Sequence, residues 1–278
     1  MNSPSKRKRI PVHGVLLLDK PAGISSTQAL AKAKWLLNAE KAGHTGTLDP
    51  FATGLLPLCF GEATKFAQDL LDADKTYEAT LNLGITTDTG DTEGQVIETR
   101  AVDVSDERIA QVLSEFLGEI RQTPPMYSAL KRDGKPLYAY AREGVTLERE
   151  ARAVFIHELA LLGREADQLR VRVSCSKGTY VRVLGEDIGK ALGCGAHLIA
   201  LRRTRIAGID ISAATRIEHL EAAPDQNRGA LLLPVDTLLS GFPSIVIADE
   251  LTRRFRQDRK STRLNSSHEW ISRMPSSA

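Results

Sequence analysis

The chain has 278 residues, of which 42% are hydrophobic, so it can bury a full core in one large domain with a smaller one beside it. Its formal net charge of +2 offers no general argument for polyanion binding. No run approaches the roughly 18 apolar residues of a membrane span, and the basic N-terminus lacks the apolar segment of a signal peptide. We therefore expect a soluble, cytoplasmic protein.

The three cysteines, Cys59, Cys175 and Cys194, stand far apart and form no CxxC pair. Free thiols in a reducing compartment fit this spacing better than disulfides or zinc. No second histidine stands at ligand spacing from His44. We therefore expect no metal.

Residues 258–278 have no apolar period, and their first half resembles the translation of a common sequencing-library adapter. We expect them to be a non-native tail. They carry four basic and two acidic side chains, which leaves residues 1–257 formally neutral. Nucleic-acid binding would therefore rest on local clusters such as Lys6–Arg9 and Arg202–Arg205, although such clusters are more often solvated surface.

The first half of the chain predicts a strand, a helix and another strand. The segment Gly14–Gly23 reads as a buried strand stopped by proline and glycine. A helix should follow over Thr27–Leu37, capped by Ser25 or Ser26. "TYEATLNLG" then alternates as a half-buried strand, with Tyr77 on its core-facing side.

The second half predicts an amphipathic helix over Ser105–Gly118 and a strand over Leu169–Cys175 that feeds a helix over Val181–Leu192. This mixture indicates an α+β fold with a mixed, largely antiparallel sheet flanked by helices. The segment Pro243–Gln257 reads as the first strand and helix of a second, small domain.

"GHTGTLDPFATGLLPLCFG" places a single acidic residue, Asp49, among glycines, threonines and leucines. The glycine spacing matches no phosphate-binding loop. An aspartate before proline often only caps a turn, but a nucleophile or base needs an ionised carboxylate in an apolar enclosure with a nearby cation. The residues that would enclose it are Leu48, Phe51, Leu55 and Leu56.

Three further residues have both ordinary and functional interpretations. Arg182 stands in the first turn of a helix with a core-facing side, where a buried guanidinium requires an acidic partner. Tyr77 is by default a core aromatic, and His44 a hydrogen-bonded loop histidine. The segment Pro124–Gly144 interleaves three tyrosines with basic residues, which suits RNA but also an ordinary lysine-rich loop.

Six segments between Leu16 and Gly208 resemble, in family order, the TruB family of tRNA pseudouridine synthases. They are "LLLDKPAGISS", "GHTGTLDPFATGLLPLCFGEATKF", "KTYEATLNLG", "QTPPMYSALKRDGKPLYAYAREG", "VSCSKGTYVRVLGEDIG" and "HLIALRRTRIAG". The resemblance implies a pseudouridine synthase catalytic domain at residues 10–240, with an RNA-clamping loop insertion at about residues 122–152. The segment 241–257 would begin a truncated RNA-binding domain of the PUA kind.

The resemblance implies an isomerase that converts uridine to pseudouridine at position 55, in the T-arm loop of tRNA. Asp49 would be the catalytic carboxylate, Arg182 its charged partner, and Tyr77 the aromatic that stacks on the base and assists removal of the C5 proton. The sequence leaves open whether Asp49 attacks the sugar, adds to the base or removes a sugar proton. No cofactor is implied. The expected partner is the T-arm stem-loop, bound by a monomer that needs no obligate protein partner.

The target uridine would be extruded from the folded loop at a cost of about a few kcal/mol. The resemblance assigns His44 to the vacated space, Tyr180 and Leu201 to the base pocket, and Lys20 to a basic position near the site. It also implies that three arginines meet RNA phosphates: Arg202, Arg203 and Arg205.

Three other functions stay open. A subunit of a guided ribonucleoprotein would use the same aspartate but should carry protein-docking extensions, and none is evident beyond the basic N-terminus. A non-catalytic tRNA-binding or folding protein would use the loop structurally. A hydrolase with an aspartate nucleophile would want a second acid and a metal. The acids available to it are Asp74, Asp88, Asp91 and Glu93, without clear ligand spacing.

Overall fold

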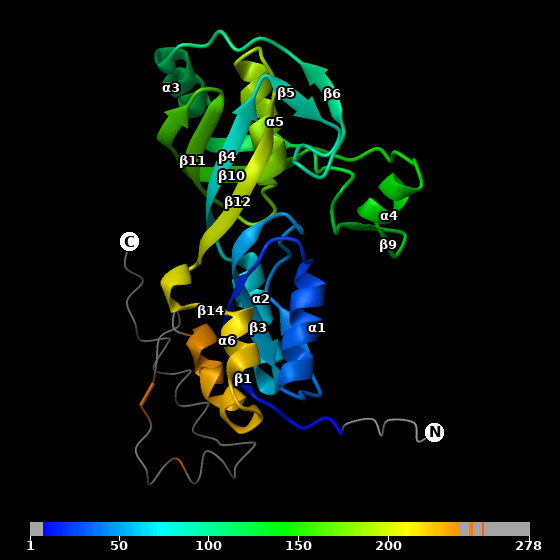
Figure 1. The fold of residues 1–278 in the computed structure, drawn as a ribbon, viewed down its shortest axis with the longest axis vertical. Coiled ribbons are helices and arrows are strands. Elements are labelled where there is room, and N and C mark those ends of the chain that lie inside the picture. The colour runs from blue at the N-terminus through cyan, green and yellow to red at the C-terminus, as the bar shows by residue number, and fades with distance from the viewer. Residues whose placement is uncertain (1–7, 240–244, 247–251, 253–278) are drawn as a thin grey trace, which may run out of the picture. The chain divides into compact units, whose positions relative to one another are not determined.

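The structure is a computed structural model that describes residues 8–239, 245–246 and 252. The chain separates into two compact units, residues 1–239 and 240–278, and every element named below belongs to the first (Figure 1). The predicted domain at 241–257 and the predicted tail at 258–278 lie outside the described residues, apart from three positions.

The elements follow the mixed order that the sequence predicts. The strands are β1 (Gly14–Lys20), β2 (Ala42–His44), β3 (Thr53–Phe60), β4 (Lys75–Leu83), β5 (Ile85–Thr87), β6 (Val96–Thr99), β7 (Gly118–Gln122), β8 (Lys131–Arg132), β9 (Lys135–Pro136), β10 (Arg152–Glu165), β11 (Gln168–Cys175), β12 (Ala196–Ile206), β13 (Ile209–Asp210) and β14 (Thr215–Arg216). The helices are α1 (Ser26–Leu36), α2 (Ala67–Asp72), α3 (Asp106–Glu115), α4 (Leu137–Arg142), α5 (Val181–Ala191) and α6 (Ile217–Ala222). Short 3-10 turns are η1 (Gly61–Lys65), η2 (Ile211–Ala213), η3 (Asp225–Leu231) and η4 (Val235–Leu239).

One ten-stranded mixed sheet organises the described residues. Its path is β14-β1-β3-β12-β4-β11-β10-β7, with β2 beside β3 and β13 beside β12. The β1–β14 and β3–β12 pairs are parallel, and the other pairs of this sheet are antiparallel. Figure 1 shows α1 and α6 near β1, and α3 and α5 near β4, β10 and β11. The predicted α+β fold with a largely antiparallel sheet flanked by helices is therefore confirmed.

Strands β1 and β3 are covered on both faces, which explains their unbroken apolar sequences. One face, with Leu16 and Leu56, joins the main core together with residues of α1, α3, α5 and α6. The opposite face, with Val15 and Leu55, joins a second core with residues of α2, η1 and η4. Because a fully buried leucine stabilises the fold by about 1.5–3 kcal/mol, these two strands anchor the sheet on which the site is built.

Strand β4 is buried on one face only, as its alternating sequence predicts. Tyr77 lies on the core face and is 9% exposed. It stands opposite Val173 of β11 on one side and Arg203 of β12 on the other. The hydrophobic alternation thus places the aromatic ring toward the interior.

Two parts of the sheet were not predicted. The segment Ala196–Ile206 forms β12, which lies between β3 and β4, although its arginine cluster reads as a surface sequence. Strands β2 and β3 take up more than half of Gly43–Gly61, which the sequence pattern treats as one loop. Only the residues between these two strands form the turn that carries Asp49.

Replacing Gly54 by alanine should strongly destabilise the fold, because Gly54 has φ +107° and a Cβ there would lie 2.3 Å from the Arg203 carbonyl oxygen. We expect the free energy of unfolding to fall by at least about 3 kcal/mol. Urea denaturation measures the loss. The matched control is Gly43→Ala in β2, where a Cβ meets no atom within 4 Å and the change should be small. Equal stability of the two variants would contradict the close approach of β3 and β12.

Candidate active site

The turn that carries Asp49 is held from both sides by hydrogen bonds. The Ser26 hydroxyl accepts from the Leu48 N–H (2.8 Å) and donates to the Leu48 carbonyl (3.1 Å). The Gly23 N–H donates to the Pro50 carbonyl (2.8 Å). Ser26 begins α1, so the helix whose N-cap is Ser25 fixes the residue next to the carboxylate. The Asp49 side chain itself is 34% exposed and faces a cavity.

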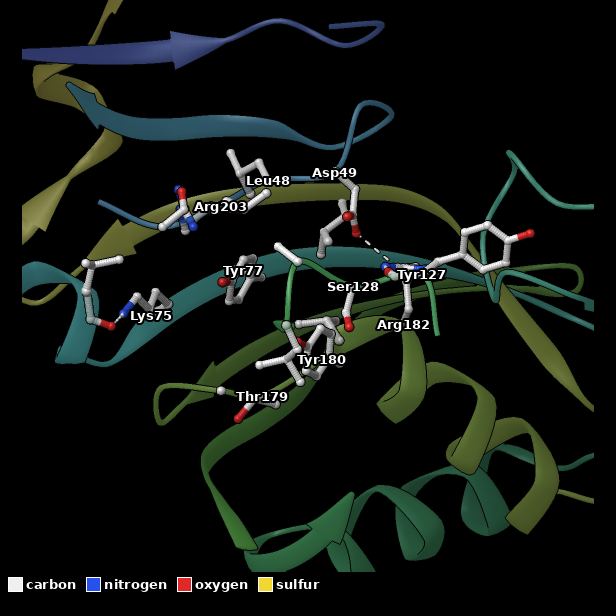
Figure 2. Close-up of a pocket in the computed structure, with 18 of the residues that line it drawn as sticks. Leu48, Asp49, Lys75, Tyr77, Tyr127, Ser128, Thr179, Tyr180, Arg182 and Arg203 are labelled. Atoms are coloured by element: carbon white, nitrogen blue, oxygen red, sulfur yellow. Dashed lines mark hydrogen bonds and ion pairs between the residues drawn. The ribbon is translucent and has the colours of Figure 1, made fainter. Parts of the chain in front are cut away.

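Arg182, in the first turn of α5, is fully engaged within the protein and 4% exposed. Its Nε lies 3.0 Å from Asp49 Oδ2 and 3.4 Å from Asp91 Oδ2. Its Nη1 donates to the Thr89 carbonyl (2.9 Å) and its Nη2 to the Tyr127 carbonyl (2.6 Å). Figure 2 shows the guanidinium facing the Asp49 carboxylate, with a dashed line for their ion pair. One side chain thus joins three segments that are distant in sequence.

The sequence did not predict that Asp91 contacts Arg182. It indicated Asp91 only as an acid available to a hydrolase. Its side chain is 3% exposed. Its Oδ1 accepts from the Thr89 hydroxyl (2.6 Å) and the Glu93 N–H (3.0 Å), and its carbonyl accepts from the Thr87 hydroxyl (2.9 Å). The signal in the sequence was "DTGDTEG", a run rich in turn-forming residues that leaves one acid facing inward.

Asp49 experiences opposing electrostatic effects. Burial raises the pKa of the Asp49 carboxyl above its usual 3.8, the Arg182 cation lowers that pKa, and the Asp91 carboxylate raises it again. The two carboxylates therefore compete for one guanidinium. Because Asp49 is largely shielded from water, the Arg182 cation is the main group that stabilises its ionised form.

Lys20, at the end of β1, is 0% exposed. Its Nζ donates to the carbonyls of Pro21 (2.8 Å), Ile24 (2.6 Å) and Pro50 (3.3 Å). Burial lowers the pKa of Lys20 to about 8, and the nearby Asp49 carboxylate acts in the opposite direction. The ammonium group thus ties the connection between β1 and α1 to the turn that carries Asp49, and Lys20 is not part of the cavity wall.

A cavity of about 340 Å³ opens beside Asp49. Tyr77, Tyr180 and Leu201 line it together with Asp49 and Arg182, and Figure 2 shows the two aromatic rings facing the same space. Burial raises the pKa of both phenols, so both stay protonated near neutral pH. The site therefore combines an ionisable carboxylate with aromatic walls.

The enclosure differs from the expected one. Of the four apolar neighbours predicted to surround Asp49, only Leu48 lines the cavity. Leu55 and Leu56 are fully buried on opposite faces of β3 and belong to the two cores. Distant segments supply the other apolar lining: Leu71, Ala129, Leu130 and Val181.

His44 does not line the cavity. It ends β2, is half-buried, and its Nδ1 is buried without a hydrogen-bond partner among the described residues. Burial lowers the pKa of His44, and the Arg203 cation lowers it further. The ring is therefore neutral at pH 7 and available to donate or accept one hydrogen bond.

The expectation that Arg203 meets a phosphate is wrong, because this residue is 1% exposed. Its Nε donates to the Leu55 carbonyl (2.8 Å) and its Nη2 to the Gly46 carbonyl (3.3 Å). It therefore braces β3 and the start of the turn that carries Asp49. Arg202 and Arg205 reach the surface, each in an ion pair with an aspartate of this chain.

Other classes of site find no support within the described part of the chain. It contains no group of three or more histidine, cysteine, aspartate or glutamate side chains arranged to hold a metal ion. None of its helices is both long and apolar enough to cross a membrane. The three cysteines are buried and free, as their spacing predicts.

Two family models match adjacent regions of the chain, and both describe TruB-type pseudouridylate synthases. The N-terminal domain of the TruB family pseudouridylate synthases matches residues 34–181. The C-terminal domain of tRNA pseudouridylate synthase B matches residues 182–240. The boundary falls at Arg182, so the two matched regions meet in the site.

Two curated relatives carry the name tRNA pseudouridine synthase B. The protein from Ralstonia pickettii (strain 12J) is 58% identical over 256 residues, which is 91% of this chain and 80% of the relative. The protein from Cupriavidus metallidurans is 56% identical over 262 residues, or 94% of this chain and 83% of the relative.

Solved structures of more distant proteins share the fold. The crystal structure of a Cbf5-Nop10-Gar1 complex matches with a TM-score of 0.64 and 33% identity, over 81% of this chain and 61% of that chain. An H/ACA RNP bound to a substrate RNA containing 2'-deoxyuridine matches with a TM-score of 0.60 and 30% identity. That match covers 81% of this chain and 60% of that chain.

Replacing Arg182 by glutamine should destabilise the protein, because it leaves two neighbouring carboxylates without a buried cation. We expect the free energy of unfolding to fall by about 3–5 kcal/mol, measured by urea denaturation. The control is Arg205→Gln, which removes an exposed ion pair with Asp210 and should change stability by about 0–1 kcal/mol. Similar losses for the two variants would show that the buried cluster is not stabilised through Arg182.

Proposed function

The chain belongs to the TruB family of pseudouridylate synthases, and from that premise we propose that it converts uridine to pseudouridine at position 55, in the T-arm loop of tRNA. It is an isomerase, and Asp49 is its catalytic carboxylate. The observation that carries the proposal is the 3.0 Å contact between Arg182 Nε and Asp49 Oδ2 at the wall of an aromatic-lined cavity. The name shared by relatives at 56–58% identity supports tRNA as the substrate.

The reaction needs a site of this composition. The bond from uracil N1 to ribose C1' breaks, the base turns, a bond forms between C5 and C1', and the C5 proton is lost while N1 regains one. Atoms and electrons balance within the nucleoside, so no co-reactant takes part. The cavity must hold a detached base in place while one carboxylate acts at the sugar or base, and aromatic walls suit a flat pyrimidine.

Arg182 acts by keeping Asp49 charged and aimed. Charge-assisted contacts are stronger than neutral ones, and a guanidinium fixed by four acceptors does not have to reorganise during the reaction. Tyr77 lies on the wall beside Asp49 and stacks on the uracil ring. Tyr180 and Leu201 complete the base pocket.

The target uridine is flipped out of the loop before reaction. Extrusion costs about a few kcal/mol, which stacking in the cavity and a side chain in the vacated space offset. His44, outside the cavity wall, is the candidate for that space. Lys20 assists indirectly, because its three carbonyl contacts hold the connection between β1 and α1 against the turn that carries Asp49.

The insertion that carries β8, β9 and α4 supplies further RNA contacts. Tyr138 is 40% exposed, and the Arg142 guanidinium lies 5.4 Å from its ring centroid. Lys135 Nζ lies 4.5 Å from the Tyr140 ring centroid. Exposed aromatic rings next to cations can stack on bases while the cations meet phosphates. Figure 1 shows this segment projecting from the sheet beside α5.

We propose that the protein acts on tRNA by itself, as a monomer without an obligate protein partner. The 56–58% identity with proteins named tRNA pseudouridine synthase B exceeds the 33% identity with the chain in the Cbf5-Nop10-Gar1 complex. A guided ribonucleoprotein subunit is therefore the less favoured function.

The direct test is to incubate purified protein with an unmodified tRNA transcript, without cofactor or guide RNA, and to map pseudouridine by carbodiimide labelling and primer extension. We expect a single stop one nucleotide 3' to position 55 of the T-arm loop. A transcript with cytidine at that position is the control and should show none. Modification only at other positions, or only with added guide RNA, would overturn the proposed substrate.

Asp49→Asn tests the catalytic role and the electrostatics together. Pseudouridine formation should fall by more than about 10⁴-fold, since an amide cannot act as an ionised carboxylate. The fold raises the pKa of the Asp49 carboxyl above its value in the unfolded chain. As the pH rises, the unfolded chain therefore loses the Asp49 proton at a lower pH than the folded protein does. Ionisation of Asp49 thus lowers the free energy of unfolding. At pH 7 the variant should therefore be at least as stable as the wild type, and the difference should vanish well below pH 3.8.

The control for this variant is Asp69→Asn, which changes an exposed acid of α2 and should leave activity unchanged. Thermal unfolding across pH and single-turnover rates provide the two measurements. An Asp49→Asn protein with activity within tenfold of the wild type would contradict the assignment. A variant much less stable than wild type at pH 7 would contradict the raised pKa.

A further inference from the structure

Ser128 presents a buried hydroxyl that the protein itself does not use. The residue is 5% exposed and lines the cavity beside Asp49. Its Oγ forms no hydrogen bond to any described protein atom. Figure 2 places Ser128 between Asp49 and Tyr180, which are on opposite sides of it in this view.

The backbone around Ser128 is fixed, so this hydroxyl cannot reach bulk water by a small loop movement. The preceding carbonyl, of Tyr127, accepts from Arg182 Nη2 (2.6 Å). The Ser128 carbonyl accepts from the Tyr138 N–H in α4 (3.1 Å), and its N–H donates to the Met126 carbonyl (2.9 Å). Arg182 therefore holds the insertion at Tyr127, next to the residue that carries the hydroxyl.

A buried hydroxyl without a partner lowers stability, and folded proteins contain few of them. Its desolvation costs about 1–3 kcal/mol when no hydrogen bond compensates. Ser26 shows the ordinary solution, since its equally buried Oγ exchanges two hydrogen bonds with Leu48. Burial raises the pKa of the Tyr180 phenol, and Ser128 lowers it as a neighbouring hydrogen-bonding group. The Ser128 Oγ and the Tyr180 hydroxyl nevertheless do not reach full hydrogen-bond geometry.

The chemistry of the cavity indicates what the hydroxyl meets. Tyr77, Tyr180 and Leu201 offer faces and apolar surface, which suit the flat sides of a pyrimidine. Asp49 and Arg182 satisfy one another at one end of the cavity. The edge of a uracil carries two carbonyl oxygens, which would be left unpaired on entering such a site unless a donor stands ready. Ser128 is a fixed donor of this kind.

We propose that Ser128 Oγ donates a hydrogen bond to a carbonyl oxygen of the target uracil and positions the base in the cavity. The inference rests on the proposed function and extends it to a substrate-positioning residue supplied by the insertion. Because the hydroxyl arrives on the segment that Arg182 holds through Tyr127, base recognition is complete only when the insertion is docked. A site built to hydrogen-bond its substrate discriminates strongly against analogues that lack the group.

Ser128→Ala separates this role from a structural one. The change removes an unsatisfied group, so the melting temperature should stay the same or rise. The value of kcat/KM on a T-arm stem-loop RNA should nevertheless fall by about tenfold to a hundredfold, the equivalent of one hydrogen bond to a buried group. The matched control is Ser26→Ala, which deletes a hydroxyl with two partners and should lower the melting temperature.

Modified substrates identify the atom contacted. Stem-loops with 2-thiouridine or 4-thiouridine at the target position weaken one carbonyl acceptor each, and 2'-deoxyuridine removes the ribose hydroxyl. For one of the two thio substrates, wild type and Ser128→Ala should have nearly equal activities. For 2'-deoxyuridine, the ratio of their activities should be the same as for uridine. Affinity of the stem-loop for Asp49→Asn, with and without Ser128→Ala, gives a second readout that requires no turnover.

Three results would overturn the inference. They are full activity in Ser128→Ala, a stability loss like that of Ser26→Ala with unchanged activity per folded molecule, and a ratio that responds only to 2'-deoxyuridine. A wild-type protein that forms no pseudouridine would instead overturn the proposed function. The two proposals therefore fail in different ways.

Discussion

The contact between the Arg182 guanidinium and two carboxylates is the constraint on which the site depends. Arg182 is buried at the start of α5, and its nitrogens meet Asp49, Asp91 and the carbonyls of Thr89 and Tyr127. These acceptors come from the turn that carries Asp49, the loop between β5 and β6, and the segment between β7 and β8. Burial raises the pKa of the Asp49 carboxyl, Arg182 lowers it, and the Asp91 carboxylate that shares Arg182 raises it again.

The surrounding protein holds this arrangement at some expense of stability. Lys20 and Arg203 are fully buried cations whose hydrogen bonds go to backbone carbonyls of the turn that carries Asp49 and of the segments next to it. Ser128 contributes a hydroxyl that no described protein atom satisfies. Arg203 and Ser128 line the cavity, and Lys20 binds the backbone next to Asp49, so these costly groups lie at the site or directly behind it. Such a distribution is expected where a site is organised for a substrate that completes it.

Local periodicity predicted the elements that frame the site. The strand at Gly14–Lys20, the helix capped by Ser25, the alternation around Tyr77 and the switch from β11 to α5 all follow from spacing of apolar residues. The need of Arg182 for an acid was evident too, but not that two acids would share it. Strand β12 was missed because its buried Arg203 resembles a surface residue. Asp91 was missed because tertiary contacts alone bring it to Arg182, and Ser128 because tertiary contacts alone bring it to the cavity.

The most direct measurement is the titration of the Asp49 carboxyl by ¹³C NMR in protein labelled at aspartate, with Asp49→Asn to assign the signal. Burial and the Asp91 carboxylate that competes for Arg182 both raise the pKa of Asp49 above 3.8, and the pKa should fall when Asp91→Asn removes the competing charge. Asparagine keeps the shape of Asp91, so packing should survive. A pKa at the usual value in the wild type, or one that Asp91→Asn leaves unchanged, would contradict a carboxylate governed by the shared guanidinium.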